Sequence, residues 1–362
     1  MSRVLHILGR MERGGAELRT LEVMRALSGR HRCDVCVLSG RAGELDDAVR
    51  ELGGAVHPIG LGPRFTPRFL GLLRRERYDV VHSHVHYVSG FMLMLARLAG
   101  VRGRVAHFRN STDGGAATVT RRLRNALLRG AMDRFATDIL GVAEAALDGA
   151  WDLRWRQDPR CRVIYNGIPL ARERDSSPRI GGPVLLHIGA LRRAKNHHKL
   201  LAVFAALRRR VPDLTLQLAG ADQGELAALR QQAAALGITD CVHFLGARDD
   251  VAALIERADL MIFPSLWEGL PGAVLEAAAD GLPVLASDLP VLGEMTKYLP
   301  QLAVLPVAAA DDVWADNAAL LLRTRTAEAR VAARRAFADT PFTLPRCVAQ
   351  FDELWSRYAA DA

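Results

Sequence analysis

The chain of 362 residues carries 48 Lys and Arg against 40 Asp and Glu, and half of its residues are hydrophobic. This length suits two domains better than one core, and no apolar run approaches the roughly 18 residues of a transmembrane helix. The start, Met1–Gly9, is too short for a signal peptide and predicts a first strand, so we expect a cytoplasmic protein.

The charge is unevenly distributed along the chain. Residues 1–175 contain 29 Arg, no Lys and 19 acidic residues, whereas residues 176–362 contain 19 basic and 21 acidic residues. A basic N-terminal half could meet nucleic acid, anionic lipid headgroups or a phosphate-bearing acceptor. There is no zinc-finger or RNA-binding signature, so we expect no nucleic-acid partner.

Two adjacent glycines, Gly14 and Gly15, follow the first predicted strand and precede the first helix. Glycines let backbone amides approach an oxyanion closely, and this is the usual anion-binding position of doubly wound folds. An ordinary turn between a strand and a helix is the other interpretation.

Histidines recur further along this half. His82, His84 and His86 alternate across the end of a predicted strand, which is compatible with a metal site, but no cluster of carboxylates lies nearby and we expect no metal. In the next strand, His107 and Arg109 are two residues apart and therefore share a face.

A basic helix is predicted over Thr120–Phe135, in which leucines alternate with arginines. It could lie on an anionic membrane surface, or its arginines could form a solvated face. The arginines are Arg121, Arg122, Arg124, Arg129 and Arg134, and the leucines are Leu123, Leu127 and Leu128. The first domain is predicted to span residues 1–169, followed by a charged linker at 170–183 with Ser, Pro and Gly.

The second domain is predicted to span residues 184–340 and opens with a strand. The loop that follows this strand holds Arg192, Arg193 and Lys195, which are cations that could neutralise a diphosphate.

A strand, loop, helix and strand follow one another from Ala258 to Ala286. Glu268 lies in the loop and Glu276 in the helix, whose free N–H groups point over Gly269 and Leu270. An anion site beside carboxylates suits a ligand with both phosphates and hydroxyls, such as a nucleotide sugar. A solvated loop and helix face are the alternative.

The residues of this stretch resemble the signature of retaining glycosyltransferases of family four. Pro264-Ser265, Glu268-Gly269-Leu270-Pro271, Glu276-Ala277 and Gly281-Leu282-Pro283-Val284 carry the likeness, and the two glutamates form the E-x7-E motif. The run from His82 to Tyr87 is similar to EpsF-like exopolysaccharide glycosyltransferases. The resemblance implies an α/β protein with the GT-B fold: two Rossmann-like domains facing across a cleft, with a terminal helix at 341–362 that returns to the first domain.

The same resemblance implies roles for individual residues. Glu268 would contact the donor sugar, Glu276 the ribose, and either His107 or Arg109 would take the place of a histidine that touches the sugar. Ala190 stands where the family has an arginine, so Arg192 or Arg193 would supply that charge. The remaining implied donor-binding residues are Gly14, Gly15, Lys195, Gly246, Arg248, Gly269 and Leu270.

The activity implied is transfer of a sugar, with retention, from a UDP-linked donor to a saccharide or lipid-linked acceptor in cell-surface or exopolysaccharide synthesis. No metal or cofactor is expected beside the donor, and peripheral contact with an anionic inner membrane face could occur through the basic first domain. An epimerase, a phosphorylase, a glycosyltransferase with a small-molecule acceptor and a non-catalytic sugar-nucleotide binder are the alternatives. Hydride transfer is disfavoured because no G-x-G-x-x-G follows the first strand.

Overall fold

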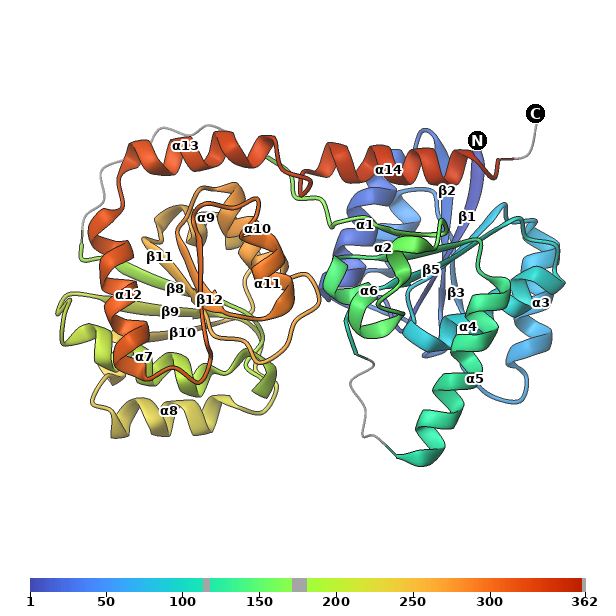
Figure 1. Ribbon diagram of the computed structural model, residues 1–362. Coiled ribbons are helices and arrows are strands. Elements are labelled where there is room, and N and C mark those ends of the chain that lie inside the picture. Colours follow the sequence, from blue (N-terminus) through green and yellow to red (C-terminus); the bar gives the residue numbers. More distant parts are fainter. Residues whose placement is uncertain (113–117, 171–180, 360–362) are drawn as a thin grey trace. The chain divides into compact units, whose positions relative to one another are not determined.

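The computed structural model describes residues 1–112, 118–170 and 181–359. The chain forms two compact units: unit 1 comprises Met1–Gly167 with Leu344–Ala362, and unit 2 comprises Ile168–Thr343 (Figure 1). Most of the predicted linker, residues 171–180, lies outside the described residues. Among the described residues, no helix has the length and hydrophobicity needed to cross a membrane.

Unit 1 is built on a seven-stranded parallel sheet in the order β3-β2-β1-β4-β5-β6-β7. Its interior strands are largely buried on both faces, as expected of parallel strands covered by helices. The strand order reverses between β1 and β4, which marks the usual ligand position of such sheets. The strands are β1 (Ser2–Leu8), β2 (His31–Val37), β3 (Val56–Pro58), β4 (Val80–Ser83), β5 (Gly103–Phe108), β6 (Asp138–Gly141) and β7 (Cys161–Val163).

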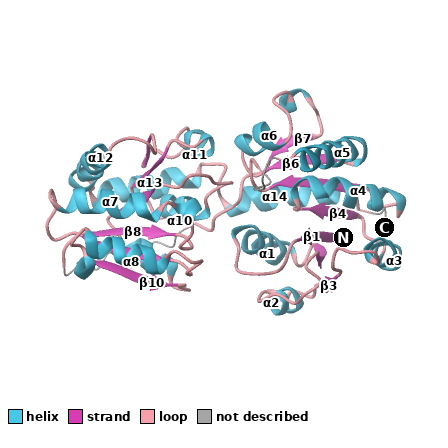
Figure 2. Cartoon of the chain, turned by 90° about the horizontal axis from the view of Figure 1, so that it is seen from below, coloured by secondary structure: helices cyan, strands magenta, loops and turns pink. Residues whose placement is uncertain are grey.

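The helices of unit 1 lie on both faces of this sheet (Figure 2). One close contact needs a glycine, because a Cβ at Gly90 on α4 would collide with the Leu128 carbonyl of α5. The α-helices are α1 (Gly15–Leu27), α2 (Asp46–Glu51), α3 (Phe65–Glu76), α4 (Ser89–Leu98), α5 (Val119–Phe135), α6 (Glu144–Ala150) and α14 (Leu344–Ser356), and the 3-10 turns are η1 (His86–Val88) and η2 (Trp155–Gln157).

The C-terminal helix α14 belongs to unit 1, although 176 residues of unit 2 precede it in the sequence. Its Cys347, Phe351 and Trp355 are buried in the core of unit 1, and its Asp352 accepts a hydrogen bond from His31 Nε2 at 2.8 Å. The predicted return of the terminal helix to the first domain is therefore confirmed.

Unit 2 repeats the architecture with six parallel strands in the order β10-β9-β8-β11-β12-β13, and here the order reverses between β8 and β11. The strands are β8 (Val184–Ile188), β9 (Thr215–Ala219), β10 (Val242–Gly246), β11 (Leu260–Phe263), β12 (Val284–Ser287) and β13 (Leu302–Leu305). The helices are α7 (His197–Arg208), α8 (Leu226–Ala235), α9 (Val251–Arg257), α10 (Gly272–Ala279), α11 (Pro290–Met295), α12 (Asp311–Thr324) and α13 (Ala327–Ala338), with 3-10 turns η3 (Arg193–Lys195) and η4 (Thr239–Cys241).

Two Rossmann-like α/β domains were predicted, and both are confirmed by these sheets. Their expected placement across a cleft stays a prediction.

Candidate active site

The strongest candidate site lies at the carboxyl edge of the unit 2 sheet, where β8 and β11 are neighbours. The loop after β8 carries Lys195 and the loop after β11 carries Glu268. Because parallel strands end at the same edge, residues 73 positions apart in the sequence meet: Lys195 Nζ lies 2.6 Å from Glu268 Oε1.

This ion pair is largely removed from water. The exposed fractions of the two side chains are 12% for Lys195 and 10% for Glu268. The ammonium also lies 4.7 Å from the centre of the Phe263 ring, a cation–π contact. Gly189 makes room for the lysine, because a Cβ at that position would approach the Lys195 side chain to 3.0 Å. A buried pair is weak evidence for stability, since desolvation offsets its attraction, so a functional reason for it is the better explanation.

Backbone contacts fix the two loops to each other. Leu266 N donates to Ala194 O at 2.8 Å, and Asn196 Nδ2 donates to Pro264 O at 3.1 Å. Asn196 has a φ of 54°, a left-handed conformation that asparagine tolerates better than most residues. The sequence prediction missed this asparagine, although an asparagine directly before a helix was a visible signal.

Two buried histidines that the sequence prediction also missed lie beside this lysine. The rings of His187 and His197 are 4.6 Å apart, and His187 Nδ1 donates to Ile262 O at 2.9 Å. Burial holds the pKa of His187 well below its ordinary value and lowers the pKa of His197 to about 4, with Lys195 adding to both shifts. Both imidazoles are therefore neutral at pH 7, and the ammonium is the positive charge at this position.

Helix α10 begins directly after the Glu268 loop. Its N-cap residue is Pro271, and no side chain caps the first turn, so its free N–H groups remain available to an anion. Gly269 and Leu270 precede this turn, as predicted, and Leu270 is buried. Glu276 lies on α10 and is half-buried.

The other predicted cations of unit 2 differ in their surroundings. Arg192 and Arg193 are exposed, and neither forms an ion pair with any described residue. Arg248 pairs instead with the exposed Asp250, at 2.6 Å. Gly246, which has a φ of 67°, ends the edge strand β10, two strands away from β8. The structure therefore brings Lys195 and Glu268 together but leaves Gly246 and Arg248 in a separate place along the same edge.

The glycine pair of unit 1 begins helix α1, with Gly14 as the N-cap and Gly15 as the first helical residue. A Cβ at Gly14 would collide with a carboxylate oxygen of Glu17, which folds back over the start of the helix. Burial raises the pKa of Glu17. A ligand anion on the predicted amides would have to displace this carboxylate, a competitor that the sequence prediction did not include.

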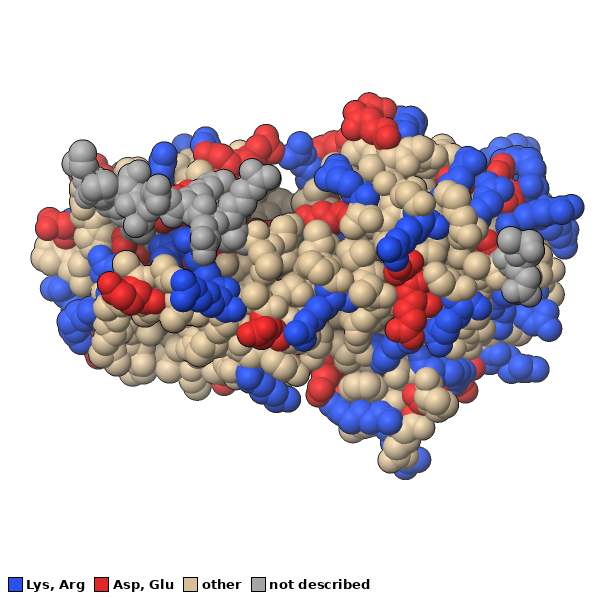
Figure 3. All heavy atoms as spheres, turned by 90° about the horizontal axis from the view of Figure 1, so that it is seen from above, with Lys and Arg blue, Asp and Glu red and all other residues tan. Residues whose placement is uncertain are grey.

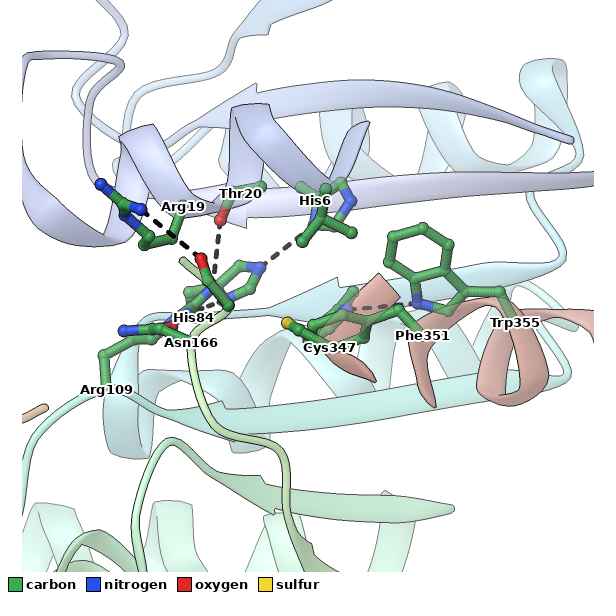
Figure 4. A pocket seen from close by; sticks show the side chains of 12 residues that line it. His6, Arg19, Thr20, His84, Arg109, Asn166, Cys347, Phe351 and Trp355 are labelled. Atoms are coloured by element: carbon green, nitrogen blue, oxygen red, sulfur yellow. Dashed lines mark hydrogen bonds between the residues drawn. The ribbon is translucent and has the colours of Figure 1, made fainter. Parts of the chain in front are cut away.

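At the carboxyl edge of the unit 1 sheet, Arg109 connects several polar side chains (Figure 4). Its guanidinium donates to His84 Nδ1 at 3.1 Å, to Asn166 Oδ1 at 2.8 Å and to Thr20 Oγ1 at 3.1 Å. Burial lowers its pKa to about 10, which still leaves it charged at neutral pH. Asn166 and Thr20 were not predicted as site residues.

Four histidine rings lie near this arginine and are joined in two hydrogen-bonded pairs. His84 Nε2 and His6 Nδ1 are 3.1 Å apart, as are His82 Nε2 and His107 Nδ1. Burial, helped by the charge of Arg109, lowers the pKa of His6 to about 3 and holds the pKa of the other three well below the ordinary value. All four are neutral at pH 7, so each ring has one donor and one acceptor nitrogen.

The Arg109 guanidinium and the Trp355 indole can only donate hydrogen bonds, and they therefore determine which ring nitrogen of each histidine carries the proton. Arg109 Nε donates to His84 Nδ1, so His84 carries its proton on Nε2 and donates from there to His6 Nδ1. The Trp355 indole, from α14, donates to His82 Nδ1 at 3.4 Å, so His82 in turn donates to His107. Both pairs end in a buried Nε2–H, on His6 and on His107, that has no hydrogen-bond partner among the described residues.

His6, His82 and His84 have nitrogen atoms within 4.8 Å of one another, which would suffice for three metal ligands. The alternating pattern in the sequence pointed to His86 as the third residue, but the third ring comes from β1, the neighbouring strand. The chemistry disfavours a metal, because the facing nitrogens already hydrogen-bond each other and the Arg109 cation lies beside them.

Comparison with known proteins now places the chain. Residues 13–172 match the model of glycosyltransferase family 4, and residues 172–335 match that of the group 1 glycosyl transferases. The capsular polysaccharide biosynthesis glycosyltransferase CapH of Staphylococcus aureus is 30% identical over 302 residues, covering 82% of this chain and 84% of CapH. The chain is a family 4 glycosyltransferase.

Other relatives extend this assignment. The putative glycosyltransferase EpsF of Bacillus subtilis is 28% identical to this glycosyltransferase over 337 residues, covering 88% of this chain and 87% of EpsF. The structure of Anabaena HepE in complex with UDP superimposes with a TM-score of 0.81 at 20% identity, covering 99% of this chain and all of HepE. At this identity the likeness shows the fold alone, which is GT-B. The predicted resemblance to exopolysaccharide glycosyltransferases is confirmed.

Proposed function

We propose that this glycosyltransferase moves a sugar, with retention, from a UDP-linked donor to a lipid-linked saccharide in the synthesis of a cell-surface polysaccharide. The observation that carries the proposal is the buried Lys195–Glu268 pair at the point of unit 2 where the strand order reverses. The support for the donor and the acceptor is the resemblance to capsular and exopolysaccharide enzymes and to a protein that binds UDP.

The geometry of the pair is compatible with separate roles for Lys195 and Glu268. An ammonium has three donors, and Lys195 uses one on Glu268 Oε1, so it can hold a phosphate oxygen at the same time. Glu268 makes no other side-chain hydrogen bond in the described part of the chain, so its second oxygen is left for a sugar hydroxyl. Glu268 would therefore position the sugar and would not attack it.

The departing diphosphate needs positive charge as the sugar becomes oxocarbenium-like. Lys195, the exposed Arg192 or Arg193, and the uncapped first turn of α10 would supply it without a metal. Gly246 and Arg248 would bind the base, Glu276 the ribose, and His107 or Arg109 of unit 1 would contact the sugar, as the family resemblance implies.

The acceptor would be held at the inner face of the membrane, with the enzyme cytoplasmic and peripheral. Figure 3 shows one face of the molecule, on which Lys and Arg side chains gather over unit 1. This agrees with 29 Arg against 19 acidic residues in residues 1–175. Such a surface attracts anionic headgroups.

The test is product analysis. The purified enzyme is incubated with UDP-, GDP- and ADP-linked sugars and a lipid-linked saccharide extract, and the anomeric proton coupling of the product is read by NMR. A new glycoside with the anomeric configuration of a UDP-linked donor is expected. An inverted product, a preference for another nucleotide, epimerised donor without acceptor, or release of a sugar phosphate would each overturn the proposal.

A further inference from the structure

Helix α5 has an apolar stripe that faces away from the rest of unit 1. Val119, Leu123 and Leu127 are 80%, 64% and 68% exposed, which is unusual for large apolar side chains. Figure 1 shows the first half of α5 extending away from the sheet of unit 1. Among the helices that the structure describes, no other has three large apolar residues exposed at successive four-residue intervals.

The stripe lies on the side of α5 opposite its packing face. At about 100° per residue, Val119, Leu123 and Leu127 fall within roughly 80° of one another, and Met132 falls about 180° from their centre. Met132 is fully buried, and the backbone of Leu128 contacts Gly90 of α4. The inward face therefore uses other residues, and the stripe contributes nothing to the core of unit 1.

Arginines border the stripe on both sides. Arg122 and Arg124 are exposed and fall roughly 100° to either side of its centre. Apolar residues between flanking arginines form the pattern of a helix that lies in the plane of an anionic bilayer interface. A second protein would require a complementary surface, whereas a lipid interface accepts an apolar stripe with a cationic border as it stands.

We propose that Val119, Leu123 and Leu127 insert into the interface of an anionic membrane while Arg122 and Arg124 bind its headgroups. This deepens the proposed function, because it names the part of the chain that would bring the enzyme to a lipid-linked acceptor. The proposal distinguishes two contributions to membrane binding: apolar insertion by α5 and the overall positive charge of unit 1.

The experiment measures sedimentation of the full-length protein with vesicles of phosphatidylcholine containing phosphatidylglycerol. The paired substitution Leu123→Gln and Leu127→Gln removes apolar area without changing charge, and we expect it to weaken partitioning by roughly tenfold or more. The pair Arg122→Gln and Arg124→Gln should weaken it by roughly fivefold per arginine at low salt and by less at high salt.

Leu320→Gln is the matched control, because Leu320 is 51% exposed on helix α12 of unit 2, and this variant should sediment like the wild type. Calorimetric titration with UDP is run on every variant. Wild-type protein that binds UDP but not the vesicles would overturn the membrane inference alone, whereas protein that binds vesicles but not UDP would contradict the proposed function alone.

Two further outcomes would also overturn the inference. One is equal binding to vesicles of phosphatidylcholine only. The other is a dimer of the wild-type protein that dissociates in the Leu123→Gln, Leu127→Gln variant without any vesicle binding, which would make a second copy of the chain the occupant.

Discussion

The two units have the same kind of strand order but differ in net charge at the edge where that order reverses. In unit 2, the edge between β8 and β11 holds an ammonium and a carboxylate 2.6 Å apart. In unit 1, the corresponding edge, at the ends of β1, β4 and β5, holds one guanidinium near four neutral imidazoles, with no carboxylate among the direct hydrogen-bond partners of the guanidinium.

This difference shows what the fold provides and what it leaves to the side chains. A reversal of strand order brings two loops to one place, but the residues in those loops decide whether the place carries a balanced pair or a net charge. Unit 2 places a cation and an anion side by side at this edge. Unit 1 is equipped to hold a single cation in a fixed orientation.

The largest expected effect concerns the ion pair of unit 2. Lys195→Ala and Glu268→Ala should each reduce sugar transfer by two to three orders of magnitude, about 3 kcal/mol of transition-state stabilisation, with circular dichroism unchanged. Wild-type-like transfer by both variants would refute the site.

A double variant of the Lys195–Glu268 pair tests its effect on stability independently of its effect on sugar transfer. Each single variant leaves a buried charge without its partner, so each should also unfold at lower denaturant concentration. Lys195→Met combined with Glu268→Gln should recover much of that stability and remain inactive. Asp47→Asn is the control, since its exposed pairing with Arg50 should contribute less than about 1 kcal/mol.

The second prediction tests the neutral histidines of unit 1. Their pKa values in the folded state are depressed, to about 3 for His6, so the unfolded chain binds protons first as the pH falls below about 6.5. The stability they contribute is present above that pH and is lost as the pH falls toward the folded-state pKa.

Urea unfolding at pH 7 and pH 5 measures this loss. His6→Gln should remove roughly 2 kcal/mol of the pH-dependent difference, the value expected for one histidine that stays neutral only when folded. His243→Gln, at an exposed position on β10, is the control and should leave the difference as in the wild type. An unchanged difference in His6→Gln would mean that His6 is charged in the folded protein.

The smallest effect belongs to Trp355. Trp355→Phe keeps an aromatic ring but removes the N–H that lies 3.4 Å from His82 Nδ1, so the free energy of unfolding should fall by less than about 1 kcal/mol. Nitrogen-15 NMR of the histidines should nevertheless show that His82 and His107 no longer hold a single tautomer. Retention of the Nε2–H form in both rings would show that the indole does not set the proton positions.

The E-x7-E motif was readable from the sequence because its residues are close together along the chain. Glu268, Gly269, Leu270 and Glu276 fall within nine positions, and they span one loop and one helix as predicted. The partners of the predicted residues were less accessible. Asn166 and Thr20 lie 57 and 89 positions from Arg109, and nothing in the local pattern connects them.

The basic helix α5 is a second case in which the local sequence did not show the tertiary packing. Alternating leucines and arginines correctly predicted a helix, and they left open whether it lies on an anionic membrane surface or presents a solvated face. In the structure Leu123 and Leu127 face outward, because Gly90 lets α4 approach the opposite side of α5.

The sequence by itself determined the two Rossmann-like domains, the family and the E-x7-E residues, because apolar periodicity, glycine positions and short motifs are local properties of the chain. Only the tertiary structure decided that Lys195 pairs with Glu268, that Glu17 covers Gly14, and that a tryptophan from the last helix sets the protons of His82 and His107. Those contacts depend on strand order and on how helices pack on the sheet. Strand order and helix packing bring together residues that are far apart in the sequence, and no local sequence pattern indicates such contacts.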